Sequence, residues 1–126
     1  MIDYQEVLEI HNVLIENFGG STGVRDGGIL KSAIERPFSG FGETEFYPTP
    51  EEKASAVLES IVKSHPFIDG NKRTGYTLMR LLLLQYQKDI NASQDEKYEL
   101  VIEVASGNLD FDDILKWIKD RVVNNF

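Results

Sequence analysis

The sequence predicts an all-α protein, built as a single domain of about six helices with one short flap or hairpin. Apolar residues recur at the three- and four-residue spacing of amphipathic helices along most of the chain. Two segments, beginning at Thr49 and Ser93, carry helix-start signals with a glutamate three residues after the cap. Residues 38–48 lack any helical period. Together these observations indicate helices joined by short connections and one non-helical flap.

Length and composition define the class of protein further. The 126 residues contain no cysteine, no internal repeat and no linker-like stretch, so we expect one domain over residues 1–126. A formal charge of −8 argues against broad binding to nucleic acid or to anionic membranes. The sequence also lacks a signal peptide pattern and an apolar run long enough to cross a bilayer. We therefore expect a cytoplasmic protein that binds neither nucleic acid nor membranes.

The first half of the chain predicts two helices and the flap. Residues about 3–17 form an amphipathic helix ended by glycines, and His11 on its apolar face is interpreted as a core residue. Asp26 caps a second helix, which Pro37 closes. In the flap, residues 38–48, four aromatic rings either fill the edge of the core or form a surface where an extended target segment docks by strand addition.

The second half predicts four more helices. One runs from Thr49 to His65, and the next, from about Asn71 to Gln87, is apolar nearly all round and is expected to be the central buried helix. A third begins at the Ser93 capping box, and the last is capped by Asp110 and includes Val122.

The loop between the third and fourth predicted helices concentrates the polar chemistry. Pro66 disfavours helix at His65, so the imidazole should lie at the tip of the preceding helix. Gly70 permits a positive φ, after which Lys72 and Arg73 fall in the first turn of the next helix. Cations are disfavoured there by about 0.3–1 kcal/mol each, because the helix dipole is positive at that end. Two cations in this turn indicate a bound anion, with phosphate as the best candidate.

If a loop that binds phosphate also transferred a phosphate-containing group to a hydroxyl, it would require a base, a metal and donors for the phosphate oxygens. One carboxylate is sufficient for Mg²⁺ when water and phosphate oxygens complete its shell. Each residue of the loop has an ordinary structural explanation when it is taken singly, and the combination favours the functional interpretation. The assignments are His65 as base, Asp69 as Mg²⁺ ligand, Gly70 and Asn71 as backbone and amide donors, and Lys72 and Arg73 as phosphate-binding cations.

Residues His65 to Arg73 resemble the signature of the Fic/Doc (Fido) superfamily, roughly H-x-F-x-D/E-G/A-N followed by G-R or K-R. The resemblance implies one of two activities, according to the residue before the arginine. Fic enzymes have glycine at this position and transfer AMP to target hydroxyls. The Doc (death on curing) branch has lysine at this position and acts as a kinase. Lys72 matches Doc, and Gly70 is the Fic-like choice. Residues 25–33 are also similar to an N-terminal segment of Doc-like proteins, so the resemblance covers most of the chain and implies a Fido-type domain.

Two departures from the Fic pattern bear on function. A second arginine commonly stands three positions after the first, where this chain has Tyr76, and Arg80 is one helical turn further on. Residues 22–27 come nearest to the inhibitory motif S/T-x-x-x-E-G/N, but Asp26 stands in place of its glutamate. We interpret these residues as helix capping and expect control by a separate protein.

The resemblance implies a Doc-like toxin that phosphorylates a Thr/Ser hydroxyl of a host protein with Mg-ATP. A translation elongation factor is the candidate target, and an antitoxin encoded alongside is the expected partner. Two alternatives remain open: a Fic-type AMP transferase, and a catalytically silent Fido domain that only binds partners.

Overall fold

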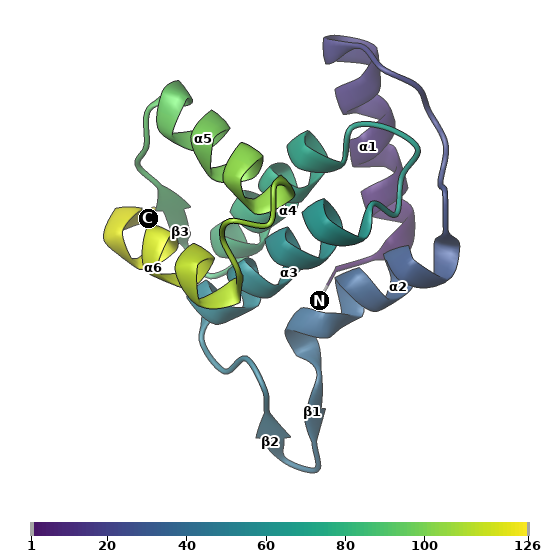
Figure 1. Cartoon of the computed structure of the whole chain (residues 1–126). Coiled ribbons are helices and arrows are strands. Elements are labelled where there is room, and N and C mark those ends of the chain that lie inside the picture. Colours follow the sequence, from purple (N-terminus) through teal and green to yellow (C-terminus); the bar gives the residue numbers. More distant parts are fainter. Residues whose placement is uncertain (1, 126) are drawn as a thin grey trace.

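The computed structural model describes residues 2–125 and confirms the predicted helical fold class (Figure 1). Every helix of this range is too short or too polar to cross a membrane. The helices are α1 (Tyr4–Phe18), α2 (Gly27–Glu35), α3 (Pro50–Ser64), α4 (Asn71–Gln85), α5 (Gln94–Ala105) and α6 (Phe111–Arg121), with a 3₁₀ turn, η1 (Arg36–Phe38), after α2. The strands are β1 (Gly40–Phe41), β2 (Thr44–Glu45), β3 (Lys88–Ile90) and β4 (Val122–Asn124).

The predicted caps explain where four of the helices begin. An Asp26 carboxylate oxygen accepts the backbone N–H of Ile29 at the start of α2, and the Thr49 hydroxyl accepts that of Glu52 at the start of α3. Ser93 and Asp110 complete capping boxes at α5 and α6, each with the acidic residue three positions on. Such a cap stabilises a helix by about 1 kcal/mol, because it pairs N–H groups that have no partner within the helix.

Helix α3 lies at the centre of the fold and contacts α2, α4, α5 and α6. Residues 53–58 along this helix are all buried, as are Ile61 and Val62 near its end. The sequence predicted α4 to be a central buried helix; α4 contacts α1, α3, α5 and β3, but its burial is incomplete. Leu81 on α4 is 38% exposed, because it borders an open groove between α1 and α4, and Tyr86, just after the helix, is 41% exposed. Helix α4 therefore has apolar residues on nearly all sides without being completely buried.

A second small sheet near the C-terminus was not predicted. Strands β3 and β4 pair antiparallel, with Ile90 opposite Val122 and Lys88 opposite Asn124. Helix α6 consequently ends at Arg121, and Val122 is extended where the sequence placed it in the helix. Strands of three residues from distant parts of the chain leave no local periodicity from which to predict them.

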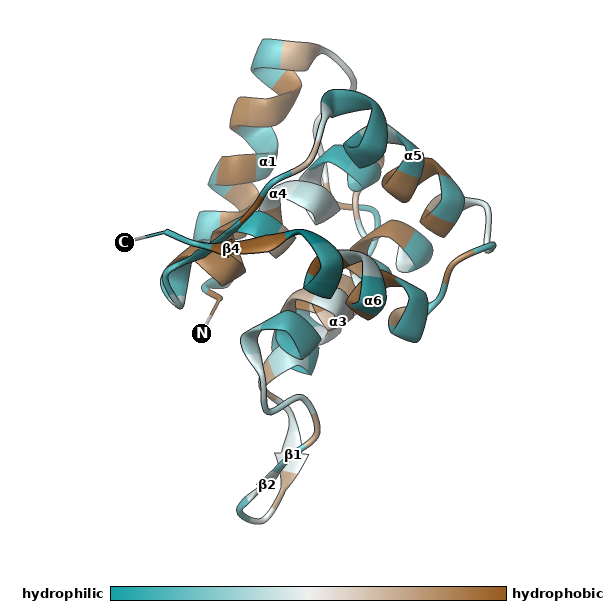
Figure 2. Ribbon diagram, turned by 90° about the vertical axis from the view of Figure 1, so that its left-hand side faces the viewer, coloured by the Kyte–Doolittle hydropathy of each residue, from teal (hydrophilic) through white to brown (hydrophobic). Residues whose placement is uncertain are grey.

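Strands β1 and β2 form the predicted flap, which projects from the helical body as a short hairpin (Figures 1 and 2). Its four aromatic rings divide between the two interpretations. Phe38 and Tyr47 at the base are partly buried, whereas Phe41 and Phe46 are 83% and 57% exposed. The base therefore packs on the core edge, and the tip presents apolar side chains to solvent.

Two cations fasten the base of the hairpin to the helices. The buried Lys53 ammonium on α3 donates to the Glu45 carboxylate at 2.9 Å and to the Tyr47 carbonyl. Arg36 of η1 donates to the Tyr47 hydroxyl at 2.9 Å and pairs with Glu59 of α3, also at 2.9 Å. These contacts hold the hairpin at a fixed place relative to α3. The candidate loop begins at the end of the same helix.

The tight packing of α4 on α3 leads to a test. A Cβ at Gly75 would lie 2.9 Å from a methyl of Val62, so we expect Gly75→Ala to lower the free energy of unfolding by about 1–3 kcal/mol. Gly28→Ala in α2 is the matched control, since its Cβ would meet nothing nearer than 3.4 Å. There the gain in helix propensity should raise stability by roughly 0.5–1 kcal/mol. Urea unfolding of both variants is the measurement, and equal effects would contradict this account of the packing.

Candidate active site

His65 ends α3 in a left-handed backbone conformation, with φ 52° and ψ 58°. The predicted position at the helix tip is confirmed, and the residue is exposed. Pro66 prevents His65 from continuing the helix, and the left-handed conformation is the usual way for a helix to end, although normally with glycine. A residue with a Cβ is less stable there by about 1–2 kcal/mol. Such strain at a histidine is a reason to look for function.

The imidazole of His65 is oriented by a neighbouring carbonyl group. Its Nδ1 lies 3.1 Å from the backbone oxygen of Lys63. Because a carbonyl oxygen can only accept, Nδ1 must carry the proton of this hydrogen bond. The neutral ring then has its lone pair on Nε2, the nitrogen available to a proton donor outside the loop. This is the tautomer that a general base requires.

A segment that we call the strap, residues 20–26 between α1 and α2, lies alongside the loop (Figure 1). The backbone N–H of Ile68 donates to the Gly23 carbonyl at 3.1 Å, and Val24 forms an isolated antiparallel bridge with Phe67. In the opposite direction, the N–H groups of Arg25 and Asp26 donate to the Pro66 carbonyl at 2.7 and 3.1 Å. The loop is therefore paired along its backbone with residues forty or more positions earlier.

The Arg25 side chain adds a second attachment, which sequence reasoning missed. Its Nε donates to the His65 carbonyl at 2.6 Å and its Nη2 to the Ser64 carbonyl at 2.7 Å. These carbonyls belong to the end of α3, where they lack helical partners and where a cation is favoured by the helix dipole. The sequence placed Arg25 only within a stretch of family resemblance, and no local pattern points to this contact.

The Asp69 carboxylate is held ionised by backbone N–H groups. Ser21 donates to one oxygen at 3.1 Å and Gly70 to the other at 2.8 Å. These two hydrogen bonds, together with the nearby Lys72 ammonium, keep the pKa of Asp69 below its ordinary value. The carboxylate thus stabilises the fold above the pKa of the unfolded chain, and this contribution is lost as the pH falls through the folded pKa. The strap can approach the carboxylate so closely because Gly20 has no side chain. A Cβ at this position would lie only 2.7 Å from the Asp69 oxygen.

The Asp69 carboxylate can supply one ligand to a Mg²⁺ ion whose other ligands come from elsewhere. A carboxylate offers roughly four acceptor positions, and the two N–H groups leave about half of them free for a cation. Residues 2–125 contain no group of three or more histidine or acidic side chains that could hold a metal ion by themselves. The site therefore suits a cation that brings most of its own oxygen ligands, as Mg²⁺ does when bound to a nucleotide.

His11 of α1 touches the loop from the core side. Its burial, with 2% exposure, confirms the prediction of a core histidine. The ring stacks on Phe67 at 3.8 Å between centroids and 5° between planes. Its Nε2 lies 2.8 Å from the Asp69 carbonyl oxygen and must donate to it. No pattern in the sequence indicates that this side chain contacts Asp69.

Asn71 holds the loop closed through its amide group. The amide NH₂ donates to the Phe67 carbonyl at 3.0 Å, and the amide oxygen accepts the Phe67 N–H, also at 3.0 Å. The side chain is buried and paired at both ends within the loop. The backbone N–H of Asn71, and not its amide, is therefore the group that can face a phosphate.

The first turn of α4 presents unneutralised positive charge. Lys72 and Arg73 are exposed, and within residues 2–125 neither forms an ion pair with a carboxylate. Arg73 instead lies over the ring of Phe18 at 4.2 Å. Helical hydrogen bonding begins with the Thr74 N–H donating to Gly70, so the N–H groups of residues 71–73 have no acceptor in the described chain. Cations and free N–H groups together form an anion site.

Comparison with known proteins identifies the family. The Fic/DOC family model matches residues 1–83, which contain both the strap and the loop. The chain belongs to the Fic/DOC family. It is also 33% identical over 117 residues to the toxin Doc of Mycolicibacterium smegmatis, a match that covers 90% of this chain and 86% of that protein.

Beyond the first turn of α4, a tyrosine stands at the position of the second Fic arginine. Tyr76, at the position of the second Fic arginine, is half-buried, and its hydroxyl has no hydrogen-bond partner among residues 2–125. Burial raises the pKa of Tyr76 to about 12, so the hydroxyl stays neutral. Arg80 forms a two-pronged ion pair with Asp89 at 2.7 and 3.0 Å. It is therefore committed elsewhere and does not replace the missing arginine.

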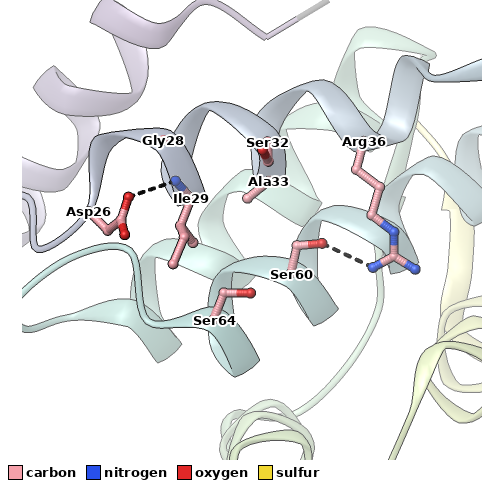
Figure 3. Close-up of a pocket in the computed structure, with 8 residues that line it drawn as sticks. All are labelled: Asp26, Gly28, Ile29, Ser32, Ala33, Arg36, Ser60 and Ser64. Atoms are coloured by element: carbon pink, nitrogen blue, oxygen red, sulfur yellow. Dashed lines mark hydrogen bonds between the residues drawn. The ribbon is translucent and has the colours of Figure 1, made fainter.

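A groove of about 680 Å³ lies between α2 and α3, beside this Fic/DOC loop (Figure 3). It extends from Asp26 and Ser64, next to His65, to Arg36 under the hairpin, with Ile29 and Ala33 between them. The groove therefore joins the loop to the flap along one face of the molecule.

The strained backbone of His65 leads to a stability test. We expect His65→Gly to be more stable than His65→Ala by about 1 kcal/mol, because glycine adopts the left-handed conformation without a steric penalty. In a regular helix the order would be reversed. Urea or thermal unfolding of the two variants is the measurement, and a more stable alanine variant would contradict the assignment of strain.

Proposed function

We propose that this protein is a Doc-like toxin, a protein kinase that transfers the γ-phosphoryl group of Mg-ATP to a Thr or Ser hydroxyl of a host protein. One observation carries the proposal: a single loop holds an imidazole with a free Nε2, an ionised carboxylate and two exposed cations that form no ion pair within residues 2–125. The relative that bears the name toxin Doc supports the biological side of the proposal.

In the proposed reaction, Nε2 of His65 removes the proton of the target hydroxyl. The hydroxyl oxygen forms a bond to the γ-phosphorus, the bond from that phosphorus to the β–γ bridging oxygen breaks, and ADP leaves with the electron pair. The imidazolium formed at His65 remains hydrogen-bonded through Nδ1 to the Lys63 carbonyl and lies at the negative end of α3. Both features stabilise the charge that the base acquires.

The remaining groups bind the phosphates. Mg²⁺, when bound by Asp69 and phosphate oxygens, neutralises charge on the transferred group. The backbone N–H groups of residues 71–73 donate to phosphate oxygens at the N-terminus of α4. Arg73 binds them through its guanidinium fork, and Lys72 as a point charge.

Lys72 is the basis for choosing phosphoryl over AMP transfer. In glycine-bearing relatives the open first turn receives the α-phosphate, whereas a lysine fills this space and adds a charge suited to a terminal phosphate. The neutral Tyr76 and the engaged Arg80 offer no cation for a γ-phosphate in the opposite orientation. The alternative, a Fic-type AMP transferase, is favoured by Gly70, and a silent binding domain would require the loop to bind no nucleotide.

The hairpin and the groove beside it are the proposed surfaces for the macromolecular partners. An extended target segment, from a protein such as a translation elongation factor, can add to the hairpin edge next to exposed Phe41 and Phe46. The strap carries no inhibitory glutamate, and its Asp26 serves as a helix cap. Inhibition is therefore assigned to a separate antitoxin whose segment folds over the flap and site on binding.

Isotope labelling in a host lysate tests the reaction. We expect the protein to transfer label from γ-labelled ATP to a lysate protein and to transfer none from α-labelled ATP. His65→Gly should lose transfer by at least ~10²-fold, because it lacks the base. Lys72→Gly should also lose kinase activity. Combined with Tyr76→Arg, it should gain weak AMP transfer.

The outcomes separate the three functions. Transfer of the α label by the wild-type protein would establish AMP transfer and rule out the proposed kinase activity. Absence of transfer with either label, in lysates from several hosts, would favour the silent domain. Full activity in His65→Gly would reject the base assignment whichever label is transferred.

Growth measurements test the toxin assignment. Induced expression of the wild-type chain in a host without a cognate antitoxin should arrest growth, whereas expression of His65→Gly at the same level should not, because its fold is retained without the base. Normal growth of cells that contain active wild-type enzyme would contradict a toxin, even if the kinase chemistry were established.

A further inference from the structure

We propose that His11 is a positioning residue for the metal-binding carboxylate, acting through the Asp69–Gly70 peptide group. The inference deepens the proposed function, since it assigns a residue of α1 to the Mg²⁺ step of the same site. It concerns a residue that the loop sequence does not contain and that would otherwise pass for ordinary core.

One peptide group connects His11 to the Asp69 carboxylate. The Asp69 carbonyl and the Gly70 N–H belong to the same peptide group, whose atoms are held coplanar by the partial double bond. His11 Nε2 donates to that carbonyl at 2.8 Å, and the Gly70 N–H donates to the Asp69 carboxylate at 2.8 Å. Fixing one end of the plane fixes the direction of the other. The imidazole therefore sets the orientation of the carboxylate without touching it.

The two hydrogen bonds also reinforce each other electrostatically. A donor on the carbonyl oxygen polarises the peptide group and makes its N–H a stronger donor, by roughly 10–30% per bond. This strengthens the bond from Gly70 to the carboxylate that already keeps the pKa of Asp69 below its usual range. His11 thus influences both the direction and the hydrogen bonding of the proposed metal ligand.

The imidazole is itself held still. Its ring stacks on Phe67 with an interplanar angle of 5° and is 2% exposed. On the loop side, a Cβ added at Gly70 would lie 3.5 Å from His11 Nε2 and 3.1 Å from Ile15 Cδ1, so the chain passes directly over these side chains. Because the ring is confined on two sides, it holds the Asp69 carbonyl at a nearly fixed position relative to α1.

A purely space-filling role makes different demands on the side chain. If His11 only fills the core under Phe67, an aromatic hydrocarbon of similar shape should replace it. If its N–H orients the Asp69–Gly70 peptide, a side chain that keeps a donor at similar reach should be the better substitute. His11→Phe retains the stacking ring without the donor, and His11→Gln retains a donor without the ring.

Two measurements on the purified protein apply this distinction. The first, without nucleotide or metal, is hydrogen exchange of the Ser21 and Gly70 amides, which donate to the Asp69 carboxylate. The second is a Mg²⁺ titration of the binding of a non-hydrolysable ATP analogue, followed by calorimetry. Val7→Ala is the matched control for lost packing, since Val7 is fully buried on the same helix, four residues before His11. Asp69→Asn serves as the metal-site reference.

For His11→Phe we expect faster exchange of both amides and a rise of about tenfold or more in the Mg²⁺ concentration needed for binding. His11→Gln should stay within a few-fold of wild type in both measurements. Val7→Ala should lower the melting temperature while leaving both readouts unchanged, and Asp69→Asn should remove the Mg²⁺ dependence. If His11→Phe fails to fold, His11→Asn, whose amide is one bond shorter, replaces it and should behave worse than His11→Gln.

Wild-type exchange and Mg²⁺ dependence in His11→Phe would overturn the inference and leave His11 as packing. A His11→Gln variant as impaired as His11→Phe would overturn it as well. If the wild-type protein itself showed no Mg²⁺-dependent binding, the proposed function would fail at its metal step. The exchange of the Gly70 amide would still decide whether His11 orients the peptide, so the two failures are distinguishable.

Discussion

The backbone pairing between the strap and the loop is the constraint on which the candidate site depends. Helices α3 and α4 determine where the loop begins and ends, but they do not determine its path. That path is fixed by hydrogen bonds from Ile68 to Gly23 and from Arg25 and Asp26 to Pro66. Arg25 then clamps the last carbonyls of α3, which keeps the exposed His65 in a conformation that it would not adopt freely.

Local signals explain the part of the structure that could be predicted. The caps at Thr49, Ser93 and Asp110 and the proline after His65 act over a few residues, and they placed the helix ends within about two positions. The residues of the loop were likewise recognised from one continuous stretch. Structural features that depend on four or five neighbouring residues could therefore be predicted from the sequence.

The features that escaped prediction all depend on contacts between distant segments. The strap, the hydrogen bond from His11 to Asp69 and the β3–β4 pair join residues that are more than thirty positions apart. The exposure of Leu81 depends on how closely α1 approaches α4, which no property of α4 itself reveals. Sequence reasoning therefore predicted the candidate groups of the site from one continuous stretch and missed the groups that hold that stretch in place.

One structural feature, the distance along the chain between the strap and the loop, has a consequence for how the protein folds. The helices can form from local contacts, but the strap must find a loop about forty residues later, and such closures are slow steps because chain entropy is lost before the contacts form. Until that closure, nothing holds the His65 ring, the Asp69 carboxylate and the α4 N-terminus in register. A newly made chain would thus become compact before the groups of its candidate site are in place.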